Sequence, residues 1–208
     1  MKVIVIGATG TIGSLAVQHM LADGHAVTAF SRTPERIGID HPELSLVSGD
    51  VLNQSEVDTA VAGHDAVVIT LGSKSLRSLI RSKGTLIVIH AMQKAGMSRL
   101  ICQSTLGAHE SWSNLNFFWK RIMFGGILRI VFRDHELQEL LVEASGLDWT
   151  IVRPSGFTDR TETEVFKEAF APTLKGLRLK IARSDVASFL TKQLTDRTYH
   201  QRAVAIST

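Results

Sequence analysis

The chain has 208 residues, of which 44% are hydrophobic and 21% charged, and its formal net charge is +3. This composition is typical of a globular domain and excludes a disordered or low-complexity chain. Because the 23 basic residues are scattered and nearly balanced by 20 acidic ones, we do not expect a nucleic-acid-binding protein. No apolar run approaches the roughly 20 residues that span a bilayer, so we expect no stable membrane insertion.

Eight segments have the pattern of β-strands, and most are continuous apolar runs rather than alternating ones. Such runs are typical of parallel strands covered by helices on both faces. The expected strands span 2–7, 26–30, 44–50, 65–72, 99–105, 148–154 and, more weakly, 177–182 and 202–207. Helical spacing covers 11–23, 54–62, 78–95 and 134–145, each followed directly by a glycine. The alternation predicts an α/β fold with a doubly wound parallel sheet in one domain, residues 1–208.

Two regions interrupt this alternation and are expected to form substrate-side insertions, residues 106–133 and 154–182. The first is rich in aromatic residues, which either cover a flat ligand or close a core or a subunit contact. A helix lying on a membrane surface is a third alternative for this region. The aromatic residues are Trp112, Phe117, Phe118, Trp119 and Phe124.

Cysteine and histidine usage gives little sign of disulfide or metal chemistry. Cys102 is the only cysteine, so an internal disulfide is excluded. Because it lies in an apolar run, we expect a buried thiol. His135 and Glu139 are the one pair whose helical spacing suits a metal, and a third ligand is missing. Because a strand is expected to begin at Lys2, we expect no signal peptide ahead of it, and we expect a cytoplasmic protein without a metal.

Three glycines follow the first predicted strand in the segment GATGTIG and precede the first helix. Gly7 permits a tight turn, Gly10 lets the backbone approach a phosphate, and Gly13 lets the helix pack closely on the strand. A helix N-terminus at this edge offers free N–H groups and the positive dipole end to a pyrophosphate. The segment therefore predicts a dinucleotide site that comprises Gly7, Thr9, Gly10, Thr11, Ile12 and Gly13.

The second predicted strand ends in FSRTPER, without the acidic residue that would bind a ribose 2′-hydroxyl. Ser31 and Arg32 follow the strand directly, and Arg36 lies four residues beyond Arg32. Two arginines here favour a 2′-phosphate and hence NADP(H) as cofactor, unless both are merely solvated surface residues.

Three further strand ends contribute candidate cofactor contacts. Asp50 and Val51 follow the third strand, where an adenine ring would lie, although Asp50 also suits a turn or a helix cap. The fourth strand ends at Leu71, Gly72 and Ser73, where the nicotinamide ribose would pass. Pro154, at the end of the sixth strand, completes the set.

The chain resembles the atypical short-chain dehydrogenase/reductase group, the NmrA-like NAD(P)-binding proteins, and within it most resembles the biliverdin-IXβ reductase/flavin reductase type. The resemblance covers nearly the whole chain and rests on GATGTIG, VSGDVLNQSEVDTAVAGHDAVVITLG, SGLDWTIVRP and IARSDVASFL. It implies a Rossmann fold with helices on both faces, NAD(P)H across the carboxyl ends of the strands, and a small, variable C-terminal part that binds substrate.

The resemblance breaks at the proton donor. The wider superfamily carries a Tyr-x-x-x-Lys pair, whereas the only tyrosine here, Tyr199, is far from any such position. NmrA-like relatives often carry a lysine where this chain has Leu140, and the flavin reductase type carries a histidine where it has Gly156. Thr105 aligns with a serine suspected of contacting substrate or nicotinamide in that family, and Ser104 precedes it. These two hydroxyls are the candidate catalytic groups, or they cap the strand end.

The expected function is an NADPH-dependent reductase that passes hydride to a flat acceptor such as a flavin, a quinone or a linear tetrapyrrole. Such acceptors need little proton delivery from the protein, so the missing Tyr/Lys pair does not preclude the reaction. The alternative is a non-catalytic NAD(P)-binding sensor or assembly protein. We expect a small-molecule partner and either a monomer or a homodimer.

Overall fold

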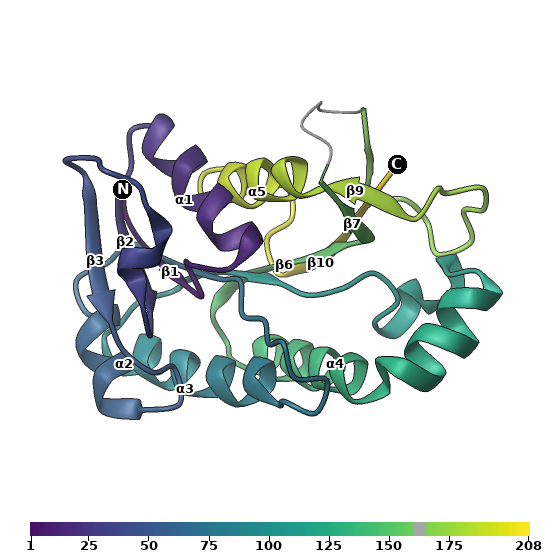
Figure 1. The fold of residues 1–208 in the computed structure, drawn as a ribbon, viewed down its shortest axis with the longest axis horizontal. Helices are drawn as coiled ribbons and strands as arrows, with labels where there is room; N and C mark the ends of the chain where they lie inside the picture. Colours follow the sequence, from purple (N-terminus) through teal and green to yellow (C-terminus); the bar gives the residue numbers. More distant parts are fainter. Residues whose placement is uncertain (160–164) are drawn as a thin grey trace.

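The computed structural model of the chain describes residues 1–159 and 165–208 (Figure 1). Its strands are β1 (Lys2–Ile6), β2 (Ala26–Ser31), β3 (Leu44–Ser48), β4 (Ala66–Ile69), β5 (Arg99–Gln103), β6 (Asp148–Pro154), β7 (Gly156–Thr158), β8 (Lys167–Glu168), β9 (Lys180–Ala182) and β10 (Arg202–Ser207). Its helices are α1 (Thr11–Ala22), α2 (Gln54–Val61), α3 (Ile80–Lys94), α4 (Arg129–Glu143) and α5 (Arg183–Lys192), with shorter or irregular helical segments η1 (Pro34–Ile37), η2 (His109–Asn114) and η3 (Phe118–Ile127).

The described residues form one sheet of eight strands in the order β3-β2-β1-β4-β5-β6-β10-β8, and β7 and β9 pair separately. Neighbouring strands of the large sheet are parallel except β8, which runs antiparallel to β10. The chain builds outward from β1 to β3 and then returns to β4 on the other side of β1. This order confirms the predicted doubly wound sheet, and the reversal places a crevice at the carboxyl ends of β1 and β4.

Helices cover both faces of the sheet, α1 and α5 on one and α2, α3 and α4 on the other (Figure 1). In β1, Val3 and Val5 pack into the core beneath α1 and α5, while Ile4 and Ile6 pack into the opposite core. The alternation of side-chain direction therefore explains why a strand buried on both faces reads as a continuous apolar run. Cys102 is a buried free thiol in the second core, as predicted.

The predicted helix ends are confirmed, because the glycine after each predicted helix has a positive φ. These residues are Gly24, Gly63, Gly96 and Gly146. One expectation was wrong in detail, because helix α4 begins at Arg129 rather than at residue 134. Helix α5 was not predicted, and β3 is an edge strand on which Leu46 is exposed.

The aromatic region 106–133 forms η2, the π-helical η3 and the first turn of α4. Together with residues from 177–179 and β10 it encloses a third, smaller core. The buried members of this core are Leu106, Leu115, Phe124, Phe132, Leu179 and Ala205, with Trp112 and Trp119 packed against them.

The other expected insertion, 154–182, contributes β7 and β9 beside this third core, and its β8 extends the main sheet. Residues 160–164 of that segment lie outside the described residues. Within the described ranges, no helix has both the length and the apolar character needed to cross a membrane.

Candidate functional site

A cleft of about 1120 Å³ runs along the carboxyl ends of the strands. Every residue predicted for the site lines it except Gly13. The lining residues among those predictions are Gly7, Thr9, Gly10, Thr11, Ile12, Ser31, Arg32, Arg36, Asp50, Val51, Leu71, Gly72, Ser73, Ser104, Thr105 and Pro154. The topology thus brings together side chains from the ends of β1, β2, β4, β5 and β6, which are far apart in the sequence.

The three glycines of the first turn have different surroundings. Gly7 has a φ of +88°, and a Cβ there would lie 2.9 Å from the carbonyl oxygen of Thr70. A Cβ on Gly13 would lie 2.4 Å from the carbonyl oxygen of Gly7, so this glycine permits helix α1 to pack on the turn. Gly10 is the least crowded, because its nearest neighbour would be the Gly7 carbonyl oxygen at 3.2 Å. Gly10 therefore leaves space in front of the helix rather than beneath it.

The N-terminus of α1 is open to the cleft. Gly10 is the N-cap residue, and no side chain caps the helix there. The first N–H groups of a helix have no partner within the helix, so Thr11 and Ile12 present donors at the positive end of the dipole. A pyrophosphate fits this donor set.

The far end of the cleft carries the predicted arginines. Arg32 and Arg36 are both exposed and lie on either side of the start of η1. Asp50 closes a turn, since its carboxylate accepts the backbone N–H of Leu52 at 2.9 Å. The turn interpretation of Asp50 is therefore confirmed, although its side chain also lies at the cleft.

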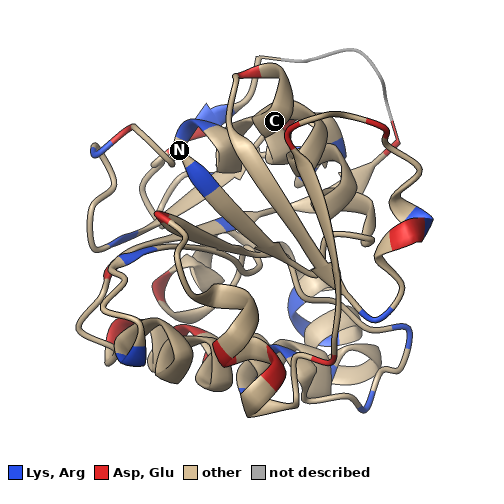
Figure 2. Cartoon of the chain, turned by 90° about the vertical axis from the view of Figure 1, so that its left-hand side faces the viewer, with Lys and Arg blue, Asp and Glu red and all other residues tan. Residues whose placement is uncertain are grey.

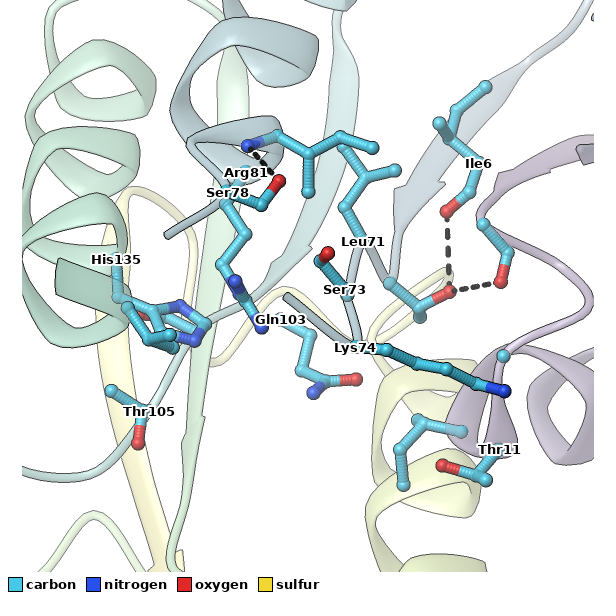
Figure 3. A pocket seen from close by; sticks show the side chains of 18 of the residues that line it. Ile6, Thr11, Leu71, Ser73, Lys74, Ser78, Arg81, Gln103, Thr105 and His135 are labelled. Atoms are coloured by element: carbon cyan, nitrogen blue, oxygen red, sulfur yellow. Dashed lines mark hydrogen bonds between the residues drawn. The ribbon is translucent and has the colours of Figure 1, made fainter. Parts of the chain in front are cut away.

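Lys74 is a basic residue that the sequence analysis missed. It follows the predicted contact Ser73, lines the cleft, and extends across it toward Thr11 at the start of α1 (Figure 3). Elsewhere Lys and Arg alternate with Asp and Glu on the helices and loops seen in Figure 2.

The middle of the cleft is lined by the ends of β4, β5 and β6. Thr105 directs a hydroxyl toward the backbone oxygen of Leu106 at 3.4 Å, a long hydrogen bond that leaves the group free to contact a ligand. Ser104 also lines the cleft but is more deeply buried. Of the two predicted hydroxyls, Thr105 is therefore the more accessible.

The aromatic residues of 106–133 divide into three groups. Trp119 and Phe124 line the cleft and also pack on each other, with ring centroids 5.4 Å apart. Trp112 packs on Phe124 and Phe132 away from the lining, so it closes the core. Phe117 is 74% exposed and Phe118 also faces solvent. The core-closing interpretation is therefore confirmed for Trp112 and Phe124, whereas the covering of a flat ligand by Trp119 and Phe124 stays a prediction.

Gly156 stands where the flavin reductase type carries a histidine, and the structure supplies a physical reason for the glycine. A Cβ at this position would lie 3.0 Å from the Trp119 ring and 3.2 Å from the carbonyl oxygen of Leu179. The indole of Trp119 therefore occupies the space that a side chain at 156 would need.

Helix α4 directs His135 into the cleft, whereas Leu140 is half exposed and does not line it. Leu140, which the resemblance aligns with the lysine of NmrA-like relatives, therefore does not reach the cleft. Burial and the charge of Arg81 lower the pKa of His135 to about 3, so its imidazole is neutral near pH 7. Arg81, on the first turn of α3, also lines the cleft and was likewise missed.

Glu139, the other half of the predicted metal pair, is committed elsewhere. Its carboxylate accepts hydrogen bonds from Arg153 at 3.1 and 2.7 Å, and both side chains are fully buried. Glu110 forms a further ion pair with Arg153. The buried Arg153–Glu139 pair ties β6 to α4, and the exposed Glu110 links it to η2. Within residues 1–159 and 165–208 no group of three His, Cys, Asp or Glu side chains could hold a metal ion.

The neutral state of His135 predicts a pH dependence of stability. The unfolded chain takes up a proton near pH 6.5 that the folded chain takes up only near pH 3. The free energy of unfolding should therefore rise with pH across this window, by up to about 1.4 kcal/mol per pH unit from this residue. Urea unfolding between pH 4.5 and 7 should give a shallower slope for His135→Gln, and the wild-type slope for the exposed control His90→Gln. Equal slopes in all three proteins would contradict the lowered pKa of His135.

Residues 7–197 match the NAD(P)H-binding family, and the chain belongs to it. The sugar epimerase YhfK of Bacillus subtilis, named as uncharacterized, is 30% identical over 217 residues, covering 98% of this chain and 92% of its own. A 3-beta-hydroxysteroid dehydrogenase of Mycolicibacterium neoaurum is 25% identical over 193 residues. That alignment covers 84% of this chain, which spans about half the length of this and the other mycobacterial steroid dehydrogenases that it matches.

Solved structures share the fold over the whole chain. The oxidoreductase ylbE of Lactococcus lactis has a TM-score of 0.84 at 20% identity, with 91% of its chain covered. A short-chain dehydrogenase/reductase of Veillonella parvula, solved with NADP, has a TM-score of 0.83 at 18% identity, with 94% of its chain covered. The anaerobillin reductase ChuY of Escherichia coli O157:H7 has a TM-score of 0.81 at 23% identity, with 97% of its chain covered. These similarities show that the chain shares the Rossmann-like α/β fold of these proteins.

Proposed function

We propose that the protein is an NADPH-dependent reductase that transfers hydride to a flat acceptor such as a flavin, a quinone or a linear tetrapyrrole. The observation that carries the proposal is the single cleft, which joins the glycine turn before α1 to the aromatic side chains of Trp119 and Phe124. The family match and the oxidoreductase and reductase relatives support the reaction class. The anaerobillin reductase ChuY shares this fold.

In this proposal each part of the cleft has one task. The N–H groups of Thr11 and Ile12 hold the pyrophosphate, with Lys74 as an additional cation. Reduced nicotinamide, when bound, supplies the hydride. Trp119 and Phe124 bound the acceptor half of the cleft, so that geometry rather than a strong acid contributes most of the rate enhancement.

The choice of NADPH rests on Arg32 and Arg36, because the end of β2 itself contributes no acidic residue to the cleft. A charge-assisted hydrogen bond contributes about 1.5–3 kcal/mol, or roughly 10- to 100-fold in affinity. Arg32→Ala should weaken NADPH binding by about that factor and leave NADH binding nearly unchanged, as measured by fluorescence titration at low salt. Arg121→Ala removes an exposed charge outside the cleft and should change neither affinity. Equal affinities for NADH and NADPH in the wild type would contradict the proposed recognition of the 2′-phosphate by Arg32.

Thr105 is proposed to contact the nicotinamide or the acceptor. Thr105→Ala should then lower kcat about 10-fold or more while leaving the Kd of NADPH nearly unchanged, because the lost hydroxyl acts beyond the pyrophosphate and the 2′-phosphate. Thr105→Ser, which keeps the hydroxyl, is the matched control and should retain most of the activity. Wild-type turnover in Thr105→Ala would remove this residue from the mechanism.

The proposed activity is tested by mixing the purified protein with NADPH and a panel of FMN, a quinone, a dichlorophenol dye and biliverdin, and following the nicotinamide absorbance. Turnover of at least one acceptor is expected. Tight NADPH binding without turnover of any acceptor would favour the second candidate, a non-catalytic NAD(P)-binding sensor or assembly protein. One observation favours that candidate: Tyr199 lies beside Phe189 and does not line the cleft, so the described residues hold no tyrosine that could donate a proton there.

A further inference from the structure

Arg81 is a buried cation whose hydrogen-bonding groups face the cleft. It lies on the first turn of α3, is only 9% exposed and lines the cleft. Its Nε and Nη1 atoms have no hydrogen-bond partner among the described residues. Burial lowers the pKa of this guanidinium, and the charge of Asp134 opposes that shift. A guanidinium keeps its proton over the whole working range of pH, so the site is positively charged.

Asp134 neutralises part of this charge without occupying the guanidinium. Its two oxygens accept the backbone N–H groups of Arg81 and Ser82 at 3.1 and 3.0 Å, together with the hydroxyl of Ser82. The closest approach between the Asp134 carboxylate and Arg81 Nη1 is 3.7 Å, too long for a good hydrogen bond. Asp134 therefore binds the start of α3 and leaves the Arg81 donors free for another anion.

The surroundings of Arg81 are polar, and Asp134 is the one carboxylate that pairs with it among the described residues. Figure 3 shows its side chain reaching down from α3 into the cleft, with His135 on one side and Gln103 on the other. His135 Nδ1 and Gln103 Oε1 are also buried and unpartnered among the described residues. The only acidic side chain that lines the described cleft is Asp50, which lies at the end of the cleft that holds Arg32. Unsatisfied buried polar atoms are costly, so their concentration here points to a polar ligand group.

We propose that Arg81 binds a carboxylate group of the hydride acceptor, which makes the preferred acceptor an acid rather than a neutral flat molecule. This inference rests on the proposed reductase function. The planar guanidinium matches a carboxylate in a paired geometry that a lysine cannot reproduce. A phosphate of the cofactor is a poorer match, because the pyrophosphate donors lie at the start of α1 and the 2′-phosphate donors lie beyond β2. Arg81 lies instead on the side of the cleft formed by β5 and α4, with Gln103, Thr105 and His135.

The test compares the binding of anthraquinone-2-carboxylate and its methyl ester to the protein saturated with NADP⁺, using titration calorimetry. The wild type should bind the acid about 10- to 100-fold more tightly than the ester. Arg81→Met should abolish this preference and leave the affinity for NADP⁺ unchanged. The control Arg133→Met removes an exposed arginine from α4, outside the cleft, and should keep the preference. Arg81→Lys should lose most of the preference for the acid over the ester. If Arg81→Met does not fold, Arg81→Lys serves as the test variant instead.

Equal binding of acid and ester by the wild type, binding of neither, or a preference that survives in Arg81→Met would overturn the proposal. A loss of NADP⁺ affinity in Arg81→Met would overturn it too, by assigning this arginine to the cofactor. The test is independent of turnover. A protein that prefers the acid but reduces no acceptor would contradict the reductase function while retaining the carboxylate site as a ligand site.

Discussion

Gly10→Val should abolish NADPH binding and leave the protein folded. The backbone of Gly10 is extended, with a φ of −73° and a ψ of 163°, a conformation that any residue adopts. Its Cβ would lie 3.2 Å from the Gly7 carbonyl oxygen and 3.9 Å from that of Thr70, so a small shift accommodates it. The branched side chain would then fill the space in front of α1 where the pyrophosphate is proposed to lie. Loss of two or more charge-assisted hydrogen bonds corresponds to more than about 100-fold in Kd.

Gly13→Val is the matched variant with the opposite outcome. Its Cβ would lie 2.4 Å from the Gly7 carbonyl oxygen and 3.0 Å from the Cα of Ala8, both backbone atoms that cannot move without displacing α1. This variant should fail to fold or should unfold at a much lower temperature. Calorimetric titration with NADPH and thermal unfolding by circular dichroism separate the two effects. Retained NADPH binding in folded Gly10→Val would mean that all three glycines serve packing alone.

Arg153→Met should destabilise the protein by about 3–5 kcal/mol, the range expected when one partner of a buried ion pair is removed. The cause is Glu139, which is 0% exposed and would be left as a buried carboxylate without its guanidinium. Burial alone already raises the pKa of Glu139, and its contacts with Arg153 oppose that effect. Urea unfolding at pH 7 gives the difference in free energy directly.

The double variant Arg153→Met with Glu139→Leu is the control, because it removes both charges and keeps apolar volume. It should recover a large part of the lost stability, since replacing a whole buried pair is often close to neutral. A double variant as unstable as Arg153→Met would show that the arginine acts by packing rather than by compensating the charge of Glu139.

Much of the fold was predictable because its signals are local. The continuous apolar runs of β1, β4 and β5 reflect burial on two faces, and the glycines after the helices reflect positive φ at their ends. The dinucleotide turn was predictable for the same reason, since strand, glycines and helix are contiguous in the chain. Whether a strand lies at the edge of a sheet depends on the order in which distant strands pair, which the sequence of one strand does not show. The exposure of β3 was therefore not predicted.

The acceptor half of the site was less predictable because it depends on packing between distant segments. Arg81 and His135 are ordinary residues on amphipathic helices, and only the packing of α3 against α4 brings them to one cleft. Trp119 could not be separated from Phe117 and Phe118 by spacing, because the π-helical η3 does not follow the regular helical period. The signal that could have identified Arg81 is a basic residue in the first turn of a helix, where acidic residues are favoured.

A crystal structure of the protein with NADP⁺ tests the proposed reductase site most directly. It should show the pyrophosphate against the N–H groups of Thr11 and Ile12, the 2′-phosphate beside Arg32, and the nicotinamide beside Thr105. Open space between the nicotinamide and Trp119 should remain for the acceptor. A dinucleotide bound in the reverse direction, or one whose nicotinamide leaves no space beside Trp119, would contradict the proposed reductase.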